Sequence, residues 1–381
     1  MKATVTKSDL VLGINRAAGA LPQRPSSLQI LQNILLEFDP SEGIIRATAT
    51  DLEIAVVVEI PATVKIQGST TLPGKKLQET IRELPEGEIS LTGNDKNTMT
   101  LKCGKARAVI KGIGREEYPG LPVLSDGAKG APQIDGAMAF KAQASVLKNA
   151  IKKTIVGASH DEARQFLTGA SLVITAKKTE FVATDGHRLA ICDFKTETKL
   201  KKGDEINVII PLRILSELSS NLPDDGIVEV QVGDTQILFV SESGIYYSRL
   251  VAEKFPDYEK IIPKSTDRKI AISRRDLIDA LRCVSPFSNP RTHAVLVSIK
   301  SDRLIIKAET PEFGEGQDEV EADIKGGSAL DISFNSNYLM DGLKVLKGED
   351  LQFEVGAKIS PAVLTSEEDS GFRYILMPLR Q

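Results

Sequence analysis

The stretch "IIRATATDLEIAVVVEIPATV", residues 44–64, consists of two runs of β-branched and small apolar residues separated by a turn that contains "ATD". The stretch "TEFVATDGHRLAICDF", residues 179–194, has the same organisation around the same three letters. Short runs rich in Val, Ile and Thr on either side of Asp and Gly are typical of two strands joined by a tight turn. We therefore expect the chain to contain this hairpin twice, which is the first sign of a duplicated fold.

The agreement between the two regions continues downstream of the hairpins. In "TTLPGKKLQETIRELPEGEISL" (70–91) and "VIIPLRILSELSSNLPDDGIVEV" (208–230), a strand reaches a proline, a helical stretch follows, and a second strand begins after "LPEG" or "LPDD". Pro73 and Pro211 are 138 residues apart, and the leucines that open "LPEG" and "LPDD" keep the same offset. A constant offset over several landmarks indicates a repeat.

A third copy is fainter. The segment "RLIIKAETPEF" (303–313) corresponds to the hairpin, and "LDISFNSNYLMDGLKVLKGEDLQFEV" (330–355) corresponds to the strand, helix and strand. Three units of roughly 127 residues account for all 381 residues, which agrees with the usual size of a domain. The predicted domains are residues 1–127, 128–258 and 259–381.

Each unit is expected to contain two helices and many short strands. Apolar residues recur at spacings of three and four, as in one-sided amphipathic helices, in the segments 6–21, 73–84, 140–157, 211–222, 272–284 and 335–347. Strands joined by Gly, Asp and Pro turns alongside such helices predict α+β domains with antiparallel sheets. The joints are expected in "YPGLPVLSDGAKGAP" (118–132) and "KFPDYEKIIPKSTD" (254–267), where prolines and glycines stop helices.

Composition indicates a folded protein that stays in solution. Hydrophobic residues make up 41% of the chain and charged residues 26%, with both signs mixed, which excludes a disordered protein. The first residues do not resemble a signal peptide and no run of 18 apolar residues occurs, so a cytoplasmic location is expected. The three cysteines are scattered and never in a CxxC pair, so we expect small buried residues and no zinc site or disulfide.

Positive charge is concentrated in the expected helices. These six segments carry a net charge of +8, so the remainder must carry −12 to give the overall −4. Two interpretations stay open: Lys and Arg are simply good helix formers on solvated faces, or the helices of all three units face one surface that holds a polyanion. With 5% aromatic residues and no Trp, few bases of a single strand could be stacked, which favours duplex nucleic acid. The helix cations in question are Lys75, Lys76, Lys141, Lys148, Lys152, Lys153, Arg213, Arg274, Arg275 and Arg282.

Asp185 and His187 raise the question of an active site. A general base with an orienting carboxylate would suit a hydrolase, yet the sequence contains no G-x-S-x-G elbow, P-loop or HExxH motif that would complete such a site. The first unit shares the Thr and the Asp of the turn but not Gly186, His187 or Arg188. The shared Asp is expected to close its own turn, and the other three residues to carry a binding role or a turn role of the second unit alone. We expect a protein without enzymatic activity, cofactor or metal.

The sequence resembles one family closely. The segments "ATDLE", "ATDGHRLA", "FPDYEKIIP" and "YILMPLR" occur in the order and spacing found in bacterial sliding clamps, the beta subunits of DNA polymerase III, and the resemblance extends from Met1 to Gln381. It implies two crescent-shaped chains that close head to tail into a ring of six similar domains, with helices lining the hole and sheets outside. Duplex DNA would pass through the hole without sequence preference, near Arg24 among other residues.

The resemblance also implies a binding site for partner peptides. In the family, an apolar cleft on the ring face receives short segments of polymerases, the clamp loader and repair proteins. Lys260 and Pro361 depart from the residues common in relatives, arginine and serine. Carried over position by position, the cleft would include Leu167, Thr184, Gly186, His187, Arg188, Leu189, Pro256, Lys260, Ile261, Asn335, Tyr338, Pro361, Val363, Leu376, Met377, Pro378, Leu379 and Arg380.

Ring closure is expected to use strand edges, since an open crescent would leave them unpaired. We predict that "KARAVIKGI" (105–113) of one chain pairs with the strand near "RLIIKA" (303–308) of another, with Phe287 packing nearby. The alternatives are a hydrolase that uses Asp185 and His187, or a monomeric scaffold that binds DNA.

Overall fold

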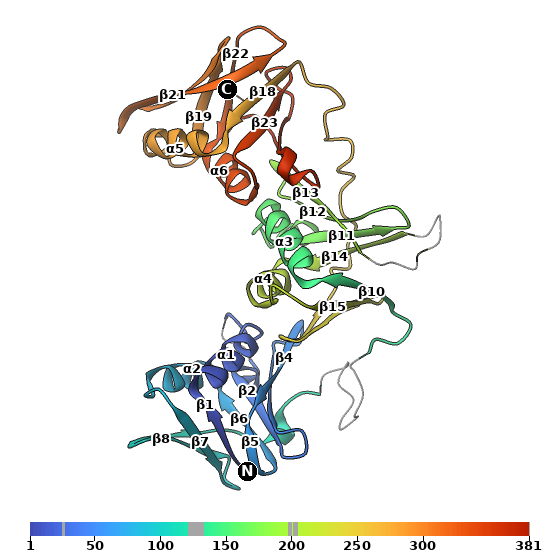
Figure 1. Cartoon of the computed structure of the whole chain (residues 1–381), viewed down its shortest axis with the longest axis vertical. Coiled ribbons are helices and arrows are strands. Elements are labelled where there is room, and N and C mark those ends of the chain that lie inside the picture. Colours follow the sequence, from blue (N-terminus) through green and yellow to red (C-terminus); the bar gives the residue numbers. More distant parts are fainter. Residues whose placement is uncertain (25–26, 121–132, 197–199, 201–204, 381) are drawn as a thin grey trace. The chain divides into compact units, whose positions relative to one another are not determined.

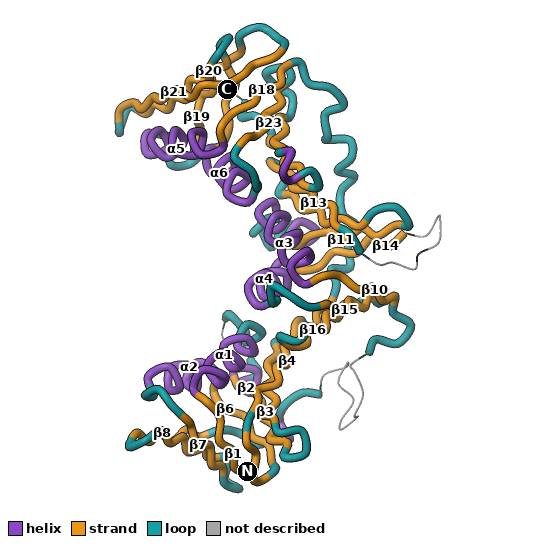
Figure 2. Tube along the Cα trace, in the orientation of Figure 1, coloured by secondary structure: helices purple, strands orange, loops and turns teal. Residues whose placement is uncertain are grey.

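The computed structural model describes residues 1–24, 27–120, 133–196, 200 and 205–380. Helices and strands follow one another in three modules with nearly the same order (Figures 1 and 2). The first module contains β1 (Lys2–Thr6), α1 (Lys7–Ala18), β2 (Asn33–Asp39), β3 (Ile44–Thr50), β4 (Ile54–Pro61), β5 (Thr63–Ile66), β6 (Gly68–Pro73), α2 (Gly74–Glu83), β7 (Glu88–Gly93), β8 (Thr98–Cys103) and β9 (Ala106–Lys111).

The second and third modules repeat this order without a counterpart of β5. The second contains β10 (Met138–Gln143), α3 (Ala144–Thr154), β11 (Gly169–Thr175), β12 (Thr179–Thr184), β13 (Arg188–Phe194), β14 (Glu205–Pro211), α4 (Leu212–Asn221), β15 (Ile227–Val232), β16 (Gln236–Ser241) and β17 (Gly244–Arg249). The third contains β18 (Arg268–Ser273), α5 (Arg274–Val284), β19 (Ala294–Ile299), β20 (Arg303–Thr310), β21 (Gly314–Lys325), β22 (Leu330–Asn335), α6 (Ser336–Val345), β23 (Asp350–Val355), β24 (Ala362–Thr365) and β25 (Phe372–Leu376). The threefold repeat is confirmed, whereas the predicted boundary between residues 127 and 128 lies outside the described residues.

A short strand precedes the first helix of each module. Two of these helices, α1 and α5, begin where a side chain of the last strand residue caps them: the Thr6 hydroxyl accepts a hydrogen bond from the Asp9 N–H, and the Ser273 hydroxyl accepts one from the Asp276 N–H. Such caps satisfy one of the free N–H groups at a helix start. Helix α3 begins at Ala144, directly after β10, so the expectation that Lys141 lies on a helix is wrong, and this residue belongs to β10.

The strands form three antiparallel sheets distributed over two compact units. One unit holds the five-stranded sheet β5-β1-β7-β8-β9 and the eight-stranded sheet β10-β15-β16-β17-β4-β3-β2-β6. The other holds the twelve-stranded sheet β14-β11-β12-β13-β25-β24-β23-β18-β21-β20-β19-β22. The middle module therefore contributes strands to both units.

Neighbouring modules are joined by the same strand pairing. Strand β4, the second strand of the first hairpin, pairs with β17, the last strand of the second module. Strand β13, the second strand of the next hairpin, pairs with β25, the last strand of the third module. Because backbone pairs continue across each joint, modules are linked by hydrogen bonds as well as by the chain.

The third module lacks the corresponding neighbour in this pairing scheme. Residues Gly314–Glu321 of β21 pair with β20 on one side, and residues 322–325 pair with β18 on the other side. The side of Gly314–Glu321 that faces away from β20 is therefore unpaired within the described chain. Strand β9, the last strand of the first module, is the edge of its sheet, and among the described strands it pairs only with β8. The segment 303–308 lies in β20, which already pairs with β19 on one side and β21 on the other, so the free edge near this segment is that of β21.

Two of the three cysteines lie in the core as expected. Cys103 and Cys192 are buried, but Cys283 is exposed on α5, so the expectation that all three are buried is wrong for this residue. Periodicity assigned Cys283 to a helix correctly but did not decide which face of the helix meets the sheet.

Candidate functional site

The turn between β12 and β13 is closed by side-chain hydrogen bonds. The Thr184 hydroxyl donates to the Arg188 carbonyl (2.6 Å) and accepts from the Gly186 N–H (3.1 Å). Asp185 Oδ1 accepts from the backbone N–H groups of His187 (2.8 Å) and Arg188 (3.0 Å). Gly186 has φ +91°, a left-handed conformation that glycine adopts at little cost. The turn is thus specified by its own residues, as the sequence indicated.

Asp185 does not orient the imidazole of His187. Its Oδ1 is used by two backbone N–H groups, and its Oδ2 accepts from Nε of Arg188 at 3.0 Å. The ring of His187 instead stacks on Tyr338, with centroids 6.2 Å apart and an interplanar angle of 20°. This arrangement lacks the carboxylate-to-imidazole contact that a catalytic pair requires.

Arg188 connects this turn to helix α6. Its Nη1 donates to Asp341 (2.6 Å) and to the hydroxyl of Tyr374 (3.4 Å), and its guanidinium lies 4.3 Å from the centroid of the Tyr338 ring. Burial raises the pKa of Tyr374 and of Tyr338, so both stay protonated and the Tyr374 hydroxyl donates to the Tyr338 carbonyl (3.0 Å). With a side chain only 10% exposed, Arg188 fixes Tyr338 beside His187.

The C-terminal segment passes beside the same turn. After β25, the Met377 N–H donates to the His187 carbonyl (2.9 Å) and the Leu379 N–H donates to the Ser333 carbonyl (2.8 Å). Met377, Pro378 and Leu379 are half-buried and Arg380 is exposed. The tail is therefore held by backbone hydrogen bonds while its side chains remain partly accessible. Apolar side chains that only fill a core would be fully buried.

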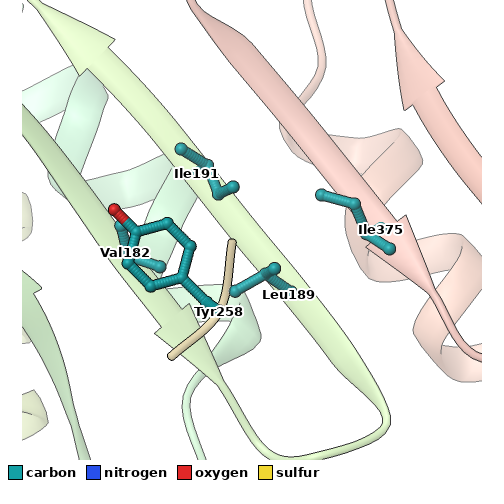
Figure 3. Packing of buried hydrophobic residues seen from close by; sticks show 5 residues of the cluster. All are labelled: Val182, Leu189, Ile191, Tyr258 and Ile375. Carbon is teal, nitrogen blue, oxygen red and sulfur yellow. The ribbon is translucent and has the colours of Figure 1, made fainter. Parts of the chain in front are cut away.

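Several residues predicted to line the cleft are buried supports. Leu167, Thr184, Leu189 and Leu376 are at most 4% exposed. Figure 3 shows Leu189 in a cluster with Val182, Ile191, Ile375 and Tyr258, and the half-buried Val363 packs against this cluster. These side chains hold the hairpin, β25 and the segment around Tyr258 together, since aromatic and aliphatic burial is the main stabilising term available here.

Asn335 is also committed within the protein. Its Oδ1 accepts from the N–H groups of Asn337 (2.9 Å) and Tyr338 (3.2 Å) at the start of α6, and its Nδ2 donates to the Thr292 carbonyl (3.1 Å). The side chain is a helix N-cap, which explains why an asparagine suits this position. It sets the first turn of the helix that carries Tyr338.

The segment 256–261 presents a mixed surface. Pro256 is half-buried, while Ile261 is 36% exposed and Lys260 is exposed and paired with Asp257 (2.7 Å). This hydrogen bond raises the pKa of Lys260. Lys260 is therefore charged and accessible, though a binding partner would compete with Asp257 for it.

Sequence reasoning missed Ile359, which is 77% exposed and is the most exposed large apolar side chain in the described part of the chain. It lies in the loop that leads to Pro361, and the next residue, Ala362, pairs with Leu376 immediately before the tail. The signal was present in the sequence: an isoleucine between Lys358 and Ser360 in a segment that ends in proline has no strand to bury it.

The cations predicted to face DNA fall into different environments. Lys153 is 3% exposed and forms an ion pair with Asp369, so its predicted role is wrong. The Nε of Arg274 donates to the Gly348 carbonyl (2.8 Å) and Nη1 to the Leu343 carbonyl (3.3 Å), so this side chain caps the end of α6 and is not available as predicted. Both errors arise because helical charge does not tell which side chains are used in tertiary contacts.

The remaining cations are more accessible. Lys148 pairs with Asp224 (2.7 Å) and Arg213 is half-buried. With the helix bounds of the structure, the six helices of the described residues carry +6, so the rest of the chain carries −10. The excess of positive charge on helices is therefore reduced but retained, and the exposed cations are Arg24, Lys75, Lys76, Lys141, Lys152, Arg275 and Arg282.

Neither a metal centre nor a membrane span is formed by the described residues. No three side chains of His, Cys, Asp or Glu gather there in a way that could hold a metal ion. None of the helices in that part of the chain has the length and apolar character needed to cross a membrane.

Comparison with known proteins covers the chain from end to end. Family models described as the N-terminal, central and C-terminal domains of the DNA polymerase III beta subunit match residues 1–122, 141–257 and 259–380. The beta sliding clamp of Synechocystis sp. (strain ATCC 27184 / PCC 6803 / Kazusa) is 30% identical over 400 residues, covering 100% of this chain and 99% of the relative. That of Bacillus subtilis (strain 168) is 27% identical over 391 residues, with both chains fully covered.

Solved structures with the same fold are also sliding clamps. The DNA polymerase III subunit beta from Pseudomonas aeruginosa superposes with a TM-score of 0.86 at 27% identity and full coverage of both chains. The sliding clamp from Bartonella birtlesii bound to griselimycin gives a TM-score of 0.89 at 29% identity, again with full coverage of both chains.

Proposed function

This chain belongs to the DNA polymerase III beta subunit family of sliding clamps, processivity factors of DNA replication, and from that premise we propose that two copies close head to tail into a ring around duplex DNA. The observation that carries the proposal is the unpaired side of β21 over Gly314–Glu321. In the two joints within the chain, the strands equivalent to β21, which are β4 and β13, pair with the last strand of the following module, β17 or β25. The last strand of the first module, β9, has no such partner within the described chain, so we expect β9 of a second copy to pair with β21.

Charge supports this pairing of β9 with β21. Strand β9 carries Arg107 and Lys111, whereas the unpaired half of β21 carries Glu315, Asp318 and Glu319. Opposite charges on two strand edges favour one pairing over self-association of like edges. Phe287 packs against Gly316, where a Cβ atom would meet its ring at 2.4 Å, so an aromatic side chain also lies at this edge.

DNA would be held by scattered, exchangeable contacts. The exposed cations Lys75, Lys152, Arg275 and Arg282 lie on helices, and Lys or Arg contacts to phosphates carry no sequence information. A ring needs little binding energy because it is retained by topology, and this permits sliding. Lys153 and Arg274 have no place in this set, and Arg24, Lys76, Lys141, Lys148 and Arg213 remain candidates.

Partner proteins would insert a peptide beside the turn after β12. The contact surface in this proposal comprises Gly186, His187, Arg188, Pro256, Lys260, Ile261, Tyr338, Ile359, Pro361, Met377, Pro378, Leu379 and Arg380. The buried Leu167, Thr184, Leu189, Asn335, Val363 and Leu376 act as its support. A pliable methionine among exposed aliphatic side chains suits Leu and Phe residues of polymerases, the clamp loader or repair proteins.

We expect the protein to act on DNA in the cytoplasm and to catalyse no reaction. Its three domains are expected near residues 1–127, 128–258 and 259–381. The hydrogen bonds of Asp185 to the backbone and to Arg188 speak against the hydrolase alternative. If His187→Ala weakens binding of a Leu- and Phe-containing peptide and no substrate turnover is found to depend on His187, the binding role is supported.

The decisive test is the mass of the protein in solution and its retention on DNA. Light scattering should give twice the 41.3 kDa chain mass, and the Arg107→Glu variant should shift the mass toward the monomer. With a clamp loader and ATP, the wild-type protein should stay on circular DNA and leave linearised DNA. A stable monomer, or equal retention on both DNAs, would favour the monomeric scaffold.

A further inference from the structure

Residues 252–267 link the second and third modules, and this linker, which the structure describes in full, forms no helix or strand. It carries Pro256, Lys260 and Ile261 of the proposed peptide surface. Because no ladder of backbone hydrogen bonds holds such a segment, side-chain contacts must fix its position. Within the linker only Tyr258 is buried, with 9% of its surface exposed.

Tyr258 anchors the linker at three points. Its ring packs in the cluster with Val182 and Leu189 of the hairpin β12–β13 (Figure 3). Its carbonyl accepts a hydrogen bond from the Ile261 N–H (3.0 Å), and its hydroxyl donates to Oε1 of Glu180. The tyrosine therefore connects the core of the hairpin to the turn that presents Ile261 at the surface.

Glu180 accepts this bond as a buried carboxylate. Its side chain is 1% exposed, and Oε1 also accepts from Nζ of Lys178 (2.6 Å). Burial opposes ionisation of Glu180, but the hydrogen bonds from Lys178 and Tyr258 outweigh it and lower the pKa of the carboxyl group. Burial and the neighbouring carboxylate raise the pKa of Tyr258. The hydroxyl therefore stays a donor and the carboxylate an acceptor, and hydrogen bonds to a charged group are the stronger ones.

The segment that follows the first module is anchored differently. There the hydroxyl of the buried Tyr118 donates to the Thr48 carbonyl (3.1 Å), and the position of Glu180 is taken by Arg46. A backbone carbonyl is present whatever the side chain, whereas the anchor of Tyr258 depends on one side chain. The acceptor of the second anchor can therefore be removed or restored by substitution.

We propose that Glu180 is a positioning residue for partner-peptide binding, because its bond to Tyr258 holds the linker in the form that presents Ile261 to the peptide. Lys260 precedes Ile261 in the same turn and is placed by the same bond. This role rests on the proposed function, since it concerns the same peptide surface. Without the bond, the turn would have to be ordered when the peptide binds, and this ordering would reduce the affinity.

The test uses the full-length protein and a fluorescein-labelled nine-residue peptide of Ser and Gly with Leu and Phe at its centre. Fluorescence anisotropy measures the affinity. Tyr258→Phe removes the hydroxyl and keeps the ring, so the affinity should fall about fivefold, and Glu180→Leu should lower it about tenfold. The variant with both changes should bind no more weakly than Glu180→Leu, since both changes break one bond. Additive losses would overturn the proposal.

Rescue by a conservative variant separates positioning from charge. Glu180→Gln keeps an acceptor for the Tyr258 hydroxyl, and its amide group would take the place of Oε2, which has no hydrogen-bond partner in the described structure. Its affinity should return to within about twofold of the wild type. Exchange of the Ile261 amide should be faster in Glu180→Leu and Tyr258→Phe but not in Glu180→Gln. A loss of affinity as large in Glu180→Gln as in Glu180→Leu would overturn the proposal.

The matched control is Tyr118→Phe, which removes a tyrosine hydroxyl from a buried hydrogen bond of the first unit. It should bind the peptide within about twofold of the wild type. A loss equal to that of Tyr258→Phe would show a general loss of stability and would overturn the positioning role. A wild-type protein without measurable affinity would overturn the peptide surface itself, whereas a wild type that binds no better than Tyr258→Phe and Glu180→Leu would overturn the positioning role alone.

Discussion

The hairpins β3–β4 and β12–β13 have the same turn but different surroundings. In the first, the Thr50 hydroxyl donates to the Ile54 carbonyl (2.7 Å), and Asp51 Oδ1 accepts from the N–H groups of Glu53 (3.0 Å) and Ile54 (2.8 Å). The second makes the same three bonds at equivalent positions. The Thr and the Asp are therefore structural, because they close the backbone identically in a module that lacks the His and Arg.

The residues that differ are those that reach outward. The position of Arg188 is taken in the first hairpin by Ile54, which is 2% exposed, and the position of Gly186 by Leu52, which is 46% exposed. Only in the second hairpin does a side chain of the turn extend to α6, through Asp341 and Tyr338. Duplication kept the turn and changed its tip, so function is to be sought in the tip.

The largest difference between the hairpins is expected on removal of the turn carboxylate. Asp185→Ala removes two backbone hydrogen bonds and leaves the largely buried Arg188 without one of its two carboxylates, which should cost about 3 kcal/mol of local stability. Asp51→Ala removes the two equivalent backbone bonds and should cost about 1 kcal/mol. Hydrogen exchange of the amides at 187–188 and 53–54 measures both.

Equal acceleration of exchange in these two variants would mean that Arg188 adds nothing to the turn. Asp185→Asn is the informative control, since its amide oxygen can still accept the backbone bonds but carries no charge for Arg188. Its effect should fall between those of the alanine variant and the wild type.

A second difference concerns the bridge from Arg188 to α6. Asp341→Asn keeps the shape of the side chain and removes its charge, so the guanidinium should hold Tyr338 less firmly and the affinity for a Leu- and Phe-containing peptide should fall by about 1 kcal/mol, roughly fivefold. Combined with Arg188→Ala, it should add little further loss, because both changes break one interaction. Isothermal titration of the four proteins gives the coupling, and additive losses would refute the bridge.

The repeat, the fold class, the hairpins and the role of Asp185 in its turn could be predicted from sequence, since each depends on local pattern and on turn chemistry. The burial of Lys153 against Asp369, residues 216 positions apart, could not. The free edge was expected near residues 303–308, but the sequence did not identify β21 as the strand that carries it, because strand order across a sheet is not a local property. The exposed Ile359 was overlooked for want of any periodic pattern in its loop.

The two hairpins also differ in a cross-strand pair. Arg46 faces Glu59 and forms an ion pair with it (3.0 Å), whereas the equivalent residues are two acids, Glu180 and Asp193. Glu180 is 1% exposed; its Oε1 accepts from Lys178 (2.6 Å) and from the hydroxyl of Tyr258, whereas its Oε2 has no hydrogen-bond partner in the described structure. Burial, with Glu180 beside it, raises the pKa of Asp193 to about 6.

The acidic pair predicts a pH dependence of the second hairpin. Asp193 binds its proton more tightly in the folded protein than in the unfolded chain, so its stabilising contribution is complete below pH 4 and is lost as pH rises to about 6. Asp193→Asn should therefore be more stable than the wild type above pH 6, by about 1 kcal/mol once the exposure of the side chain is allowed for. Glu59→Gln should show no gain there. Thermal unfolding at pH 4.5 and 7.5 measures the stability of both variants. An equal gain for Asp193→Asn at the two pH values would show that protonation of Asp193 is not the cause.

The smallest effects are expected where the two turns differ only in backbone strain. Leu52 has φ +79°, a conformation that costs a residue with a side chain about 1–2 kcal/mol. Gly186 has φ +91°, and a Cβ atom added there would meet no atom closer than Arg164 Nη1 at 3.7 Å. Gly186→Ala should destabilise its turn by about 1 kcal/mol. Leu52→Gly relieves strain but adds freedom to the unfolded chain, so a net gain of about 0.5 kcal/mol is expected. Exchange of the same turn amides tests the signs, and a loss in both variants would mean that exposed Leu52 makes contacts worth more than its strain.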